Sequence, residues 1–104
     1  MKLVYTPQAI EDIAAIKSYI ELSLRNKSAA KHIAETILQS CARLKDFPRL
    51  GFSVRERYGF ESEDRIFLCE KYVIVYAVRG DTVAVGRVID ARCDYARILW
   101  HSEL

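Results

Sequence analysis

Hydrophobic residues dominate residues 65–95, broken by short polar pairs, and this pattern predicts three consecutive strands joined by tight turns. Gly80-Asp81 separates two runs rich in valine, isoleucine and tyrosine, which is typical of a two-residue hairpin turn. Glu70-Lys71 is expected to form the other turn. With the turn at Gly80-Asp81, the expected cross-strand pairs are Val78 with Val83, Tyr76 with Val85, Ile74 with Arg87, and Tyr72 with Ile89.

Successive side chains of a strand point to opposite faces of the sheet, so this pairing sorts the residues into two sets. One face is expected to carry Tyr72, Ile74, Tyr76, Val78, Val83, Val85, Arg87 and Ile89. The other face is expected to carry Val73, Val75, Ala77, Ala84, Gly86 and Val88. Neither set is polar, although an antiparallel sheet with one wet side usually alternates apolar and polar residues. Both faces therefore need a cover.

Helical spacing of apolar residues predicts two amphipathic helices ahead of these strands. A short strand candidate at residues 2–5 precedes Thr6, a favoured N-cap, and Pro7, which suits the first helical position. Ser28 is expected to cap the second helix, which ends before Pro48. Because the link between them is short, the helices should form an antiparallel hairpin. Their apolar stripes are Ala9, Ile13, Ile16, Ile20 and Leu24, and Ala30, Ile33, Ile37, Cys41 and Leu44.

The rest of the chain completes one small domain. Residues 49–64 look irregular and carry mixed charges, and Asp94 is expected to cap a last short helix through Leu99 and Trp100. The predicted order is β-α-α-β-β-β-α, an α+β fold with an antiparallel sheet and an N-terminal helical hairpin packed on one face. A chain of 104 residues has no room for a second core, so residues 1–104 are expected to form a single domain.

The helical hairpin is expected to cover the bulkier face of the sheet, because tyrosine and isoleucine bury the most area. The smaller side chains of the other face would then form an exposed apolar patch, and such patches usually mark a partner surface. In the alternative, the 49–64 segment or the C-terminal helix folds over that face. Both alternatives stay open. The residues expected to bind a partner are Val73, Val75, Ala77, Ala84 and Val88.

Composition narrows the possible classes of function only slightly. The net charge of +2 neither demands a polyanionic partner nor rules one out. No apolar run approaches the roughly 20 residues of a membrane span, and the N-terminus lacks a signal-peptide segment, so we expect a cytoplasmic protein without a membrane partner. Cys41, Cys69 and Cys93 form no C-x-x-C pair, so neither a metal site nor dithiol chemistry is expected, and nothing indicates a cofactor.

Arg87 is the charged residue of the expected helix-facing row. A buried charge without a partner is costly, so we expect an ion pair with a carboxylate of the first helix, Asp12 being the first choice. In the alternative, Arg87 contacts a target directly. A structural ion pair implies that loss of either partner would act through folding rather than through binding.

A small polar group follows the last strand. Together they could contact a phosphate group; they are Arg92, Asp94 and Tyr95. Arginine is the preferred side chain for phosphate because its guanidinium can donate two parallel hydrogen bonds. In the alternative, Asp94 caps the last helix and Arg92 is its solvated neighbour. His101 is the one histidine expected to reach such a site, because His32 lies on the probable surface side of the second helix.

Six short motifs occur in an order that is fairly specific when taken together: Pro7-x-Ala9-x-x-Asp12-Ile13, Ala29-Ala30, Leu44-x-x-Phe47-Pro48-x-x-Gly51, Tyr72-Val73-Ile74-Val75-Tyr76, Arg87-Val88-Ile89 and Arg92-x-Asp94-Tyr95. In these motifs the chain resembles the RelE/ParE superfamily of toxins from bacterial toxin–antitoxin pairs. The resemblance implies a growth-inhibiting toxin held silent by a cognate antitoxin, whose C-terminal segment wraps the toxin. Contact with DNA would then be indirect, through the antitoxin.

The resemblance leaves two activities to separate. RelE-like members are ribosome-dependent messenger RNA endonucleases, and ParE-like members poison DNA gyrase. RNA cleavage needs an acid, a base and cations near the reacting phosphate. RelE-like members commonly place a basic residue where this chain has Val73, and many relatives place histidine where it has Asp90. The ParE-like activity, which needs no catalytic residue, is therefore favoured.

Two alternatives remain beside gyrase poisoning. A RelE-like nuclease, acting on ribosome-bound messenger RNA, would use Arg92, Tyr95 and His101. A toxin fold that has lost its activity would only bind an antitoxin.

Overall fold

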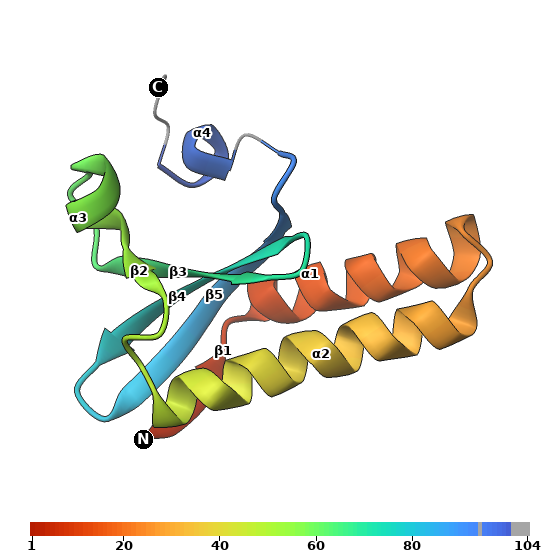
Figure 1. Ribbon diagram of the computed structural model, residues 1–104, viewed down its shortest axis with the longest axis horizontal. Helices are drawn as coiled ribbons and strands as arrows, with labels where there is room; N and C mark the ends of the chain where they lie inside the picture. The colour runs from red at the N-terminus through yellow and green to blue at the C-terminus, as the bar shows by residue number, and fades with distance from the viewer. Residues whose placement is uncertain (94, 101–104) are drawn as a thin grey trace.

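A five-stranded sheet with a helical hairpin on one face forms the centre of the molecule (Figure 1). The computed structural model describes residues 1–93 and 95–100, without the side chains of residues 96, 98 and 100. The strand order is β1 (Lys2–Tyr5), β5 (Thr82–Asp90), β4 (Tyr72–Arg79), β3 (Asp64–Cys69) and β2 (Phe52–Ser53). The α+β class with an N-terminal hairpin on the sheet is confirmed. Pairing is antiparallel from β2 to β5, whereas β1 joins β5 in parallel.

The hairpin consists of α1 (Pro7–Ser18), a π-helical turn η1 (Tyr19–Ser23) and α2 (Lys27–Asp46). Thr6 caps α1 as expected, since its hydroxyl oxygen accepts a hydrogen bond from the Ala9 backbone N–H at 3.1 Å. Asn26, not Ser28, caps α2: its side-chain oxygen accepts a hydrogen bond from the Ala29 N–H at 2.9 Å. The second helix therefore begins two residues earlier than expected, because asparagine is as good an N-cap as serine.

A β-bulge at Gly86 changes the register between β4 and β5. The pairs nearest the turn, Val78 with Val83 and Tyr76 with Val85, are those expected from the sequence. Beyond Gly86 the expected pairs are wrong: the observed ones are Val75 with Arg87, Ile74 with Val88, Val73 with Ile89 and Tyr72 with Asp90. The extra residue shifts the ladder by one position, and such a shift exchanges the faces of all later side chains. Val88 therefore belongs to the helix-side core.

Two apolar cores lie on the two faces of the sheet. On the hairpin side, Ala9, Ile37, Cys41 and Leu44 of the helices pack against Tyr72, Ile74, Tyr76, Val83, Val85 and Val88 of the strands. The second core contains Ile66, Val73 and Val75 with Val54, and it is flanked by Phe52, Tyr58, Phe60, Ala91, Tyr95 and Leu99. These flanking residues come from α3 (Val54–Tyr58), α4 (Tyr95–Trp100) and the segments beside them.

The second face of the sheet is therefore not bare, contrary to one of the two sequence-based expectations. Val73, Val75 and Ala77 are buried, with 0%, 3% and 6% of their surfaces exposed, and Ala84 is half-buried. The cover comes from residues 52–60, which looked irregular in sequence but form β2 and α3, and from α4. Val88 lies on the opposite face because of the bulge. These five residues do not form the exposed patch expected of them.

Candidate docking groove at the open edge of β3

The outer edge of β3 is only partly paired. The two residues of β2 pair with its first half, Phe52 with Ile66 and Ser53 with Arg65, whereas β4 pairs with β3 along its whole length. In the described part of the chain, residues 67–69 thus have a neighbouring strand on one side only. The backbone groups on such an edge are free to pair with another polypeptide.

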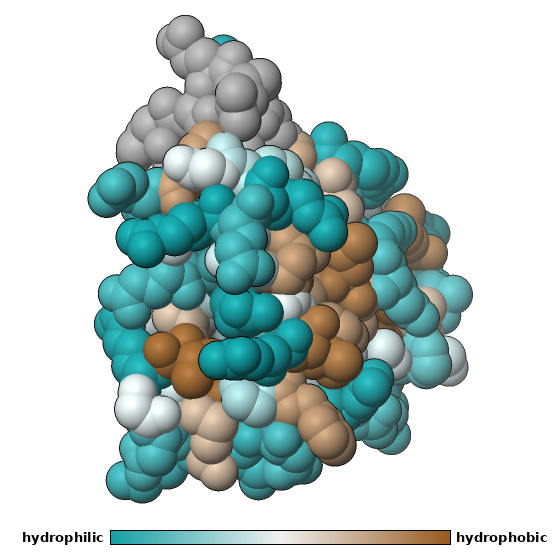
Figure 2. Space-filling view, turned by 60° about the vertical axis from the view of Figure 1, so that its left-hand side comes forward, coloured by the Kyte–Doolittle hydropathy of each residue, from teal (hydrophilic) through white to brown (hydrophobic). Residues whose placement is uncertain are grey.

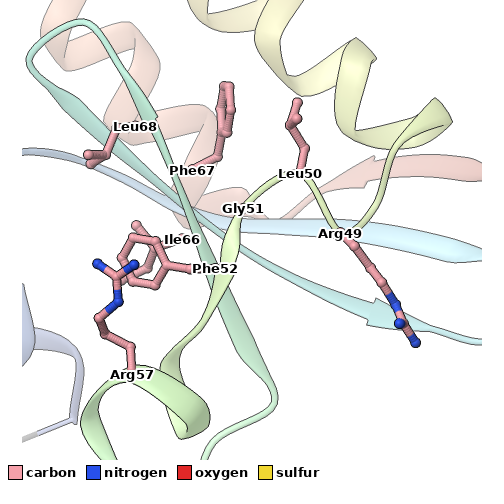
Figure 3. Close-up of a pocket in the computed structure, with 8 residues that line it drawn as sticks. All are labelled: Arg49, Leu50, Gly51, Phe52, Arg57, Ile66, Phe67 and Leu68. Carbon is pink, nitrogen blue, oxygen red and sulfur yellow. The ribbon is translucent and has the colours of Figure 1, made fainter.

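An open groove of about 500 Å³ lies along this edge (Figure 3). Leu50 and Leu68, two of its lining residues, leave 41% and 56% of their surfaces in solvent. Among the residues that the structure describes, the lining includes two arginines and no carboxylate. The groove therefore combines a free backbone edge with apolar side chains and positive charge. Its lining residues are Arg49, Leu50, Gly51, Phe52, Arg57, Ile66, Phe67 and Leu68.

The side chains of the groove point to two sides of the strand. Figure 3 shows Leu50 and Phe67 extending on one side, toward α2, with Phe52 and Arg57 on the other. The Arg57 guanidinium carbon lies 4.1 Å from the centre of the Phe52 ring, a cation–π contact that holds this charge in place. Arg49 extends away from these residues, so Arg57 is the arginine that lies beside Phe52 and Ile66.

The wall of the groove is fixed by a close chain crossing at Gly51. The Tyr76 hydroxyl accepts a hydrogen bond from the Gly51 N–H at 2.9 Å and donates one to the Pro48 carbonyl oxygen at 2.7 Å. Arg65 Nη2 donates to the Gly51 carbonyl oxygen at 2.6 Å. A Cβ atom on residue 51 would lie 2.5 Å from the Ile66 carbonyl oxygen, so only glycine fits here without movement of the backbone.

The surface around the groove is mixed in character. Figure 2, in which the β2 and α3 side of the molecule comes forward, shows hydrophobic patches interrupted by hydrophilic side chains. Near the groove, the Nε–H of Arg65 is buried and has no hydrogen-bond partner within the described residues. An unpaired buried donor is uncommon because it forfeits its hydrogen bonds to water.

Asp12 of α1 and Arg87 of β5 form the expected ion pair, although the bulge pairs Arg87 with Val75 and so removes it from the row of residues that face the hairpin. Arg87 Nε lies 2.8 Å from Asp12 Oδ2, and Arg87 Nη2 lies 3.3 Å from Oδ1. Oδ2 also accepts a hydrogen bond from the Val88 backbone N–H at 2.9 Å. One carboxylate thus joins α1 to the part of β5 that follows the bulge.

The residues expected for a nuclease are held by separate partners. Arg92 donates from Nε and Nη2 to the two carboxylate oxygens of Asp90, at 3.0 and 2.6 Å, and this contact lowers the pKa of Asp90 to about 2. The Tyr95 hydroxyl lies 3.2 Å from that of Tyr58, and this hydrogen bond, together with burial, raises the pKa of Tyr95 to about 12. His101 and the expected cap Asp94 lie outside the described residues.

The described residues contain no group of three or more histidine, cysteine or acidic residues that could hold a metal ion. Within them, no helix is both long enough and apolar enough to cross a membrane.

Sequence reasoning missed the groove because it missed β2 and α3. A local signal was present: Ser53 precedes Glu56 by three residues, a common helix start, and Gly59 follows as a helix end. The Ser53 hydroxyl oxygen accepts a hydrogen bond from the Glu56 N–H at 3.3 Å, and Gly59 adopts the left-handed conformation with φ of 75°. The open edge itself left no local signal, since it depends on which strands pair.

The family model described as "ParE toxin of type II toxin-antitoxin system, parDE" matches residues 3–95. The chain belongs to the ParE toxin family. This ParE chain also resembles a solved structure titled "Chromosomal ParDE TA system from P. aeruginosa", with a TM-score of 0.69 and 20% sequence identity. That match covers 86% of this chain and 95% of the other and supports the fold. Among curated proteins, none matches this ParE chain significantly.

The family assignment confirms the ParE-like branch of the resemblance found in the sequence. Membership makes the chain a toxin of a type II toxin–antitoxin system.

Proposed function

We propose that this ParE-family chain inhibits growth by binding and poisoning DNA gyrase in the cytoplasm, and that a cognate antitoxin neutralises it. The engagement of the expected nuclease residues is the observation that favours binding over catalysis. The Arg92 guanidinium is bound by Asp90, and the Tyr95 hydroxyl by Tyr58. A ribonuclease needs such groups free to reach the reacting phosphate.

Inducible expression of the full chain without an antitoxin tests the target. We expect growth arrest with DNA damage, inhibition of gyrase supercoiling by the purified chain, and intact messenger RNA. Arg92→Ala is the informative variant, because it removes a candidate nuclease cation from the surface. It should leave messenger RNA as intact as the parent chain does. Cuts within codons of translated messages, abolished by Arg92→Ala, would instead identify a RelE-like nuclease.

Co-expression tests the partner. A small protein encoded beside the gene of this chain, expressed together with it, should restore growth and co-purify with the chain as a complex. Harmless expression of the chain alone, with normal supercoiling and intact messenger RNA, would contradict the toxin function and leave only a binding module.

A further inference from the structure

We infer that a hollow beside β2 binds a backbone phosphate of single-stranded nucleic acid, so that this chain contacts nucleic acid directly and not only through an antitoxin. The hollow has a volume of about 200 Å³ and adjoins the groove, with which it shares two lining residues. Two guanidinium groups and one hydroxyl line it. Its lining residues are Phe52, Ser53, Glu56, Arg57 and Arg65.

The guanidinium of Arg57 is held in place without being neutralised. Its carbon lies 4.1 Å from the centre of the Phe52 ring, and Figure 3 shows the two groups side by side. Within the described residues, Arg57 takes part in no ion pair. Because an aromatic ring carries no negative charge, the full charge of Arg57 stays available to an anion. A guanidinium that is positioned in advance also loses little freedom when it binds one.

Arg65 supplies a second positive charge, which no carboxylate of the described chain pairs with. Its Nη2 donates to two neutral acceptors, the carbonyl oxygens of Gly51 at 2.6 Å and of Arg49 at 3.4 Å. Its buried Nε–H has no partner in the same part of the chain. Buried polar groups normally have a partner, so an unpaired donor on a residue that lines a hollow indicates a ligand there.

The donors of the hollow suit phosphate better than carboxylate. The Ser53 hydroxyl oxygen accepts a hydrogen bond from the Glu56 N–H at 3.3 Å, so its own proton remains as a donor. The two oxygens of a carboxylate lie in one plane and suit one guanidinium. The oxygens of a phosphodiester point in several directions and can accept from two guanidiniums and a hydroxyl together. Contacts from arginine and serine to phosphate commonly position nucleic acids on proteins.

An aromatic cluster beside the hollow favours a nucleic-acid strand over a free phosphate ion. The ring of Tyr58 lies edge-to-face with Phe52, with centroids 6.1 Å apart, and is stacked with Phe60 at 5.7 Å. All three rings are half-buried and keep part of their surface in solvent. Unpaired bases stack on aromatic rings and on guanidinium planes. The site therefore fits a strand whose bases are not held in a duplex.

Glu56 is the carboxylate of the lining, and its charge opposes that of a phosphate. The residue is exposed, so the carboxylate can turn toward solvent when a strand binds. It should nevertheless weaken the attraction, since like charges brought together cost binding energy. Removal of this charge should therefore strengthen the binding of a phosphate, whereas it would weaken the binding of a basic ligand.

The test measures binding of the purified full chain to a fluorescein-labelled decamer of deoxythymidine by fluorescence anisotropy. Binding should be saturable and should weaken steeply as salt is added, because a phosphate contact releases counterions. Unlabelled decamers of deoxythymidine and of uridine, which share the phosphodiester, should both compete, and the stronger competitor identifies the kind of strand. Duplex DNA and inorganic phosphate should each compete about tenfold less well or worse. Equal competition by either of these two, or no binding at low salt, would overturn the inference.

Arg57→Gln should weaken binding of the decamer about tenfold, the usual value of a charged hydrogen bond. Arg55→Gln is the matched control, because both arginines are exposed residues of α3 but only Arg57 lines the hollow. Glu56→Gln should strengthen binding. Equal losses in the two arginine variants would reveal general charge attraction alone and overturn the site, and so would weaker binding by Glu56→Gln. Thermal unfolding of each variant, followed by circular dichroism, separates lost binding from lost folding.

These measurements need neither gyrase nor an antitoxin, so this inference and the proposed function can fail independently. A chain that inhibits gyrase but does not bind the decamer overturns the phosphate site alone. A chain that binds the decamer through Arg57 but is harmless on expression supports the site and overturns the toxin function.

Discussion

β5 and β3 are each only partly paired with a short outer strand, and the parts left unpaired are finished in opposite ways. At the β5 edge, β1 pairs only as far as Val85, and side chains at the start of α1 then take over. Thr6 donates its N–H to the Val85 carbonyl oxygen at 2.9 Å and its hydroxyl to that of Gly86 at 2.8 Å, and Asp12 accepts the Val88 N–H. At the β3 edge, by contrast, pairing with β2 stops at Ile66 and the groove begins.

The comparison shows that this fold can satisfy the unpaired backbone groups of a strand with side chains, and that it does so at β5 but not at β3. Thr6 and Asp12 close one edge with two side chains, whereas Gly51 and Tyr76 brace the other edge just before it opens. The closed edge is thus tied into the folding of the domain, and the open edge is a surface whose wall is fixed. Substitutions at the closed edge should cost stability, and those at the open edge should affect binding.

Asp12→Ala should have the largest effect, because it breaks the closed edge. It removes the ion-pair partner of Arg87 and the acceptor of the Val88 N–H. The Asp12 side chain is largely buried and that of Arg87 is partly buried. Loss of one partner of such a pair typically costs about 3–5 kcal/mol in the free energy of unfolding. Urea denaturation measures the change, with the exposed neighbour substitution Glu11→Ala as control. A loss below about 1 kcal/mol would mean that α1 is held to β5 by other contacts.

Gly51→Ala should come next. Its Cβ would meet the Ile66 carbonyl oxygen at 2.5 Å and the Tyr76 ring at 2.8 Å, so the crossing chain must move. Overpacking of this kind costs about 1–3 kcal/mol, and the upper end is expected because one neighbour is backbone. The midpoint of urea unfolding should fall accordingly. An unchanged midpoint would show that the wall of the groove is pliable.

Tyr76→Phe tests the brace more gently, since the ring stays and only the hydroxyl is lost. The buried Gly51 N–H then lacks its acceptor, and the Pro48 carbonyl oxygen lacks its donor. An unsatisfied buried group costs about 1–3 kcal/mol. Calorimetric unfolding should show this loss, and faster hydrogen exchange at the Gly51 amide should accompany it. Exchange unchanged at that amide would contradict the role of the hydroxyl.

The Asp90–Arg92 pair should contribute a small effect that depends on pH. The pKa of Asp90 is lowered to about 2 in the fold, from an ordinary value of 3.8, mainly by its hydrogen bond with Arg92. Because the folded value is the lower one, the contribution is fully present above about pH 4 and is lost as the pH falls toward 2. Asp90→Asn should therefore flatten the stability profile in that window. A profile parallel to that of the parent chain would contradict the assigned pKa.

Leu68→Thr should have the smallest effect on folding, since Leu68 leaves 56% of its surface in solvent and threonine suits a strand. The free energy of unfolding should change by no more than about 0.5 kcal/mol. Capture of the co-expressed small protein should nevertheless weaken, because an apolar contact of the groove is lost. Equal losses of stability and binding would remove the contrast between the two edges.

Most of the fold could be predicted from local sequence patterns. The helix start at Thr6, the helix end before Pro48 and the turn at Gly80-Asp81 are each decided by a few neighbouring residues, and all three appear in the structure. The pair between Asp12 and Arg87 was also foreseeable, because a charge in an apolar row needs a partner close by.

Two features were missed because periodicity assumes unbroken elements. Gly86, a glycine within a strand, was the available signal for the bulge, and ignoring it placed Val88 on the wrong face. The groove depends on residues from the α2–β2 link, α3 and β3, which meet only after the strands have paired. The spacing of residues along the chain therefore could not predict that these segments lie side by side.

The parallel pairing of β1 with β5 has a consequence for synthesis of the protein. Lys2 lies beside Thr82, so the first strand made by the ribosome has no neighbour until the last strand has left it. Contacts so distant along the chain form late and slowly. The nascent polypeptide can build its hairpin early, but the five-stranded sheet is completed only after β5 has left the ribosome.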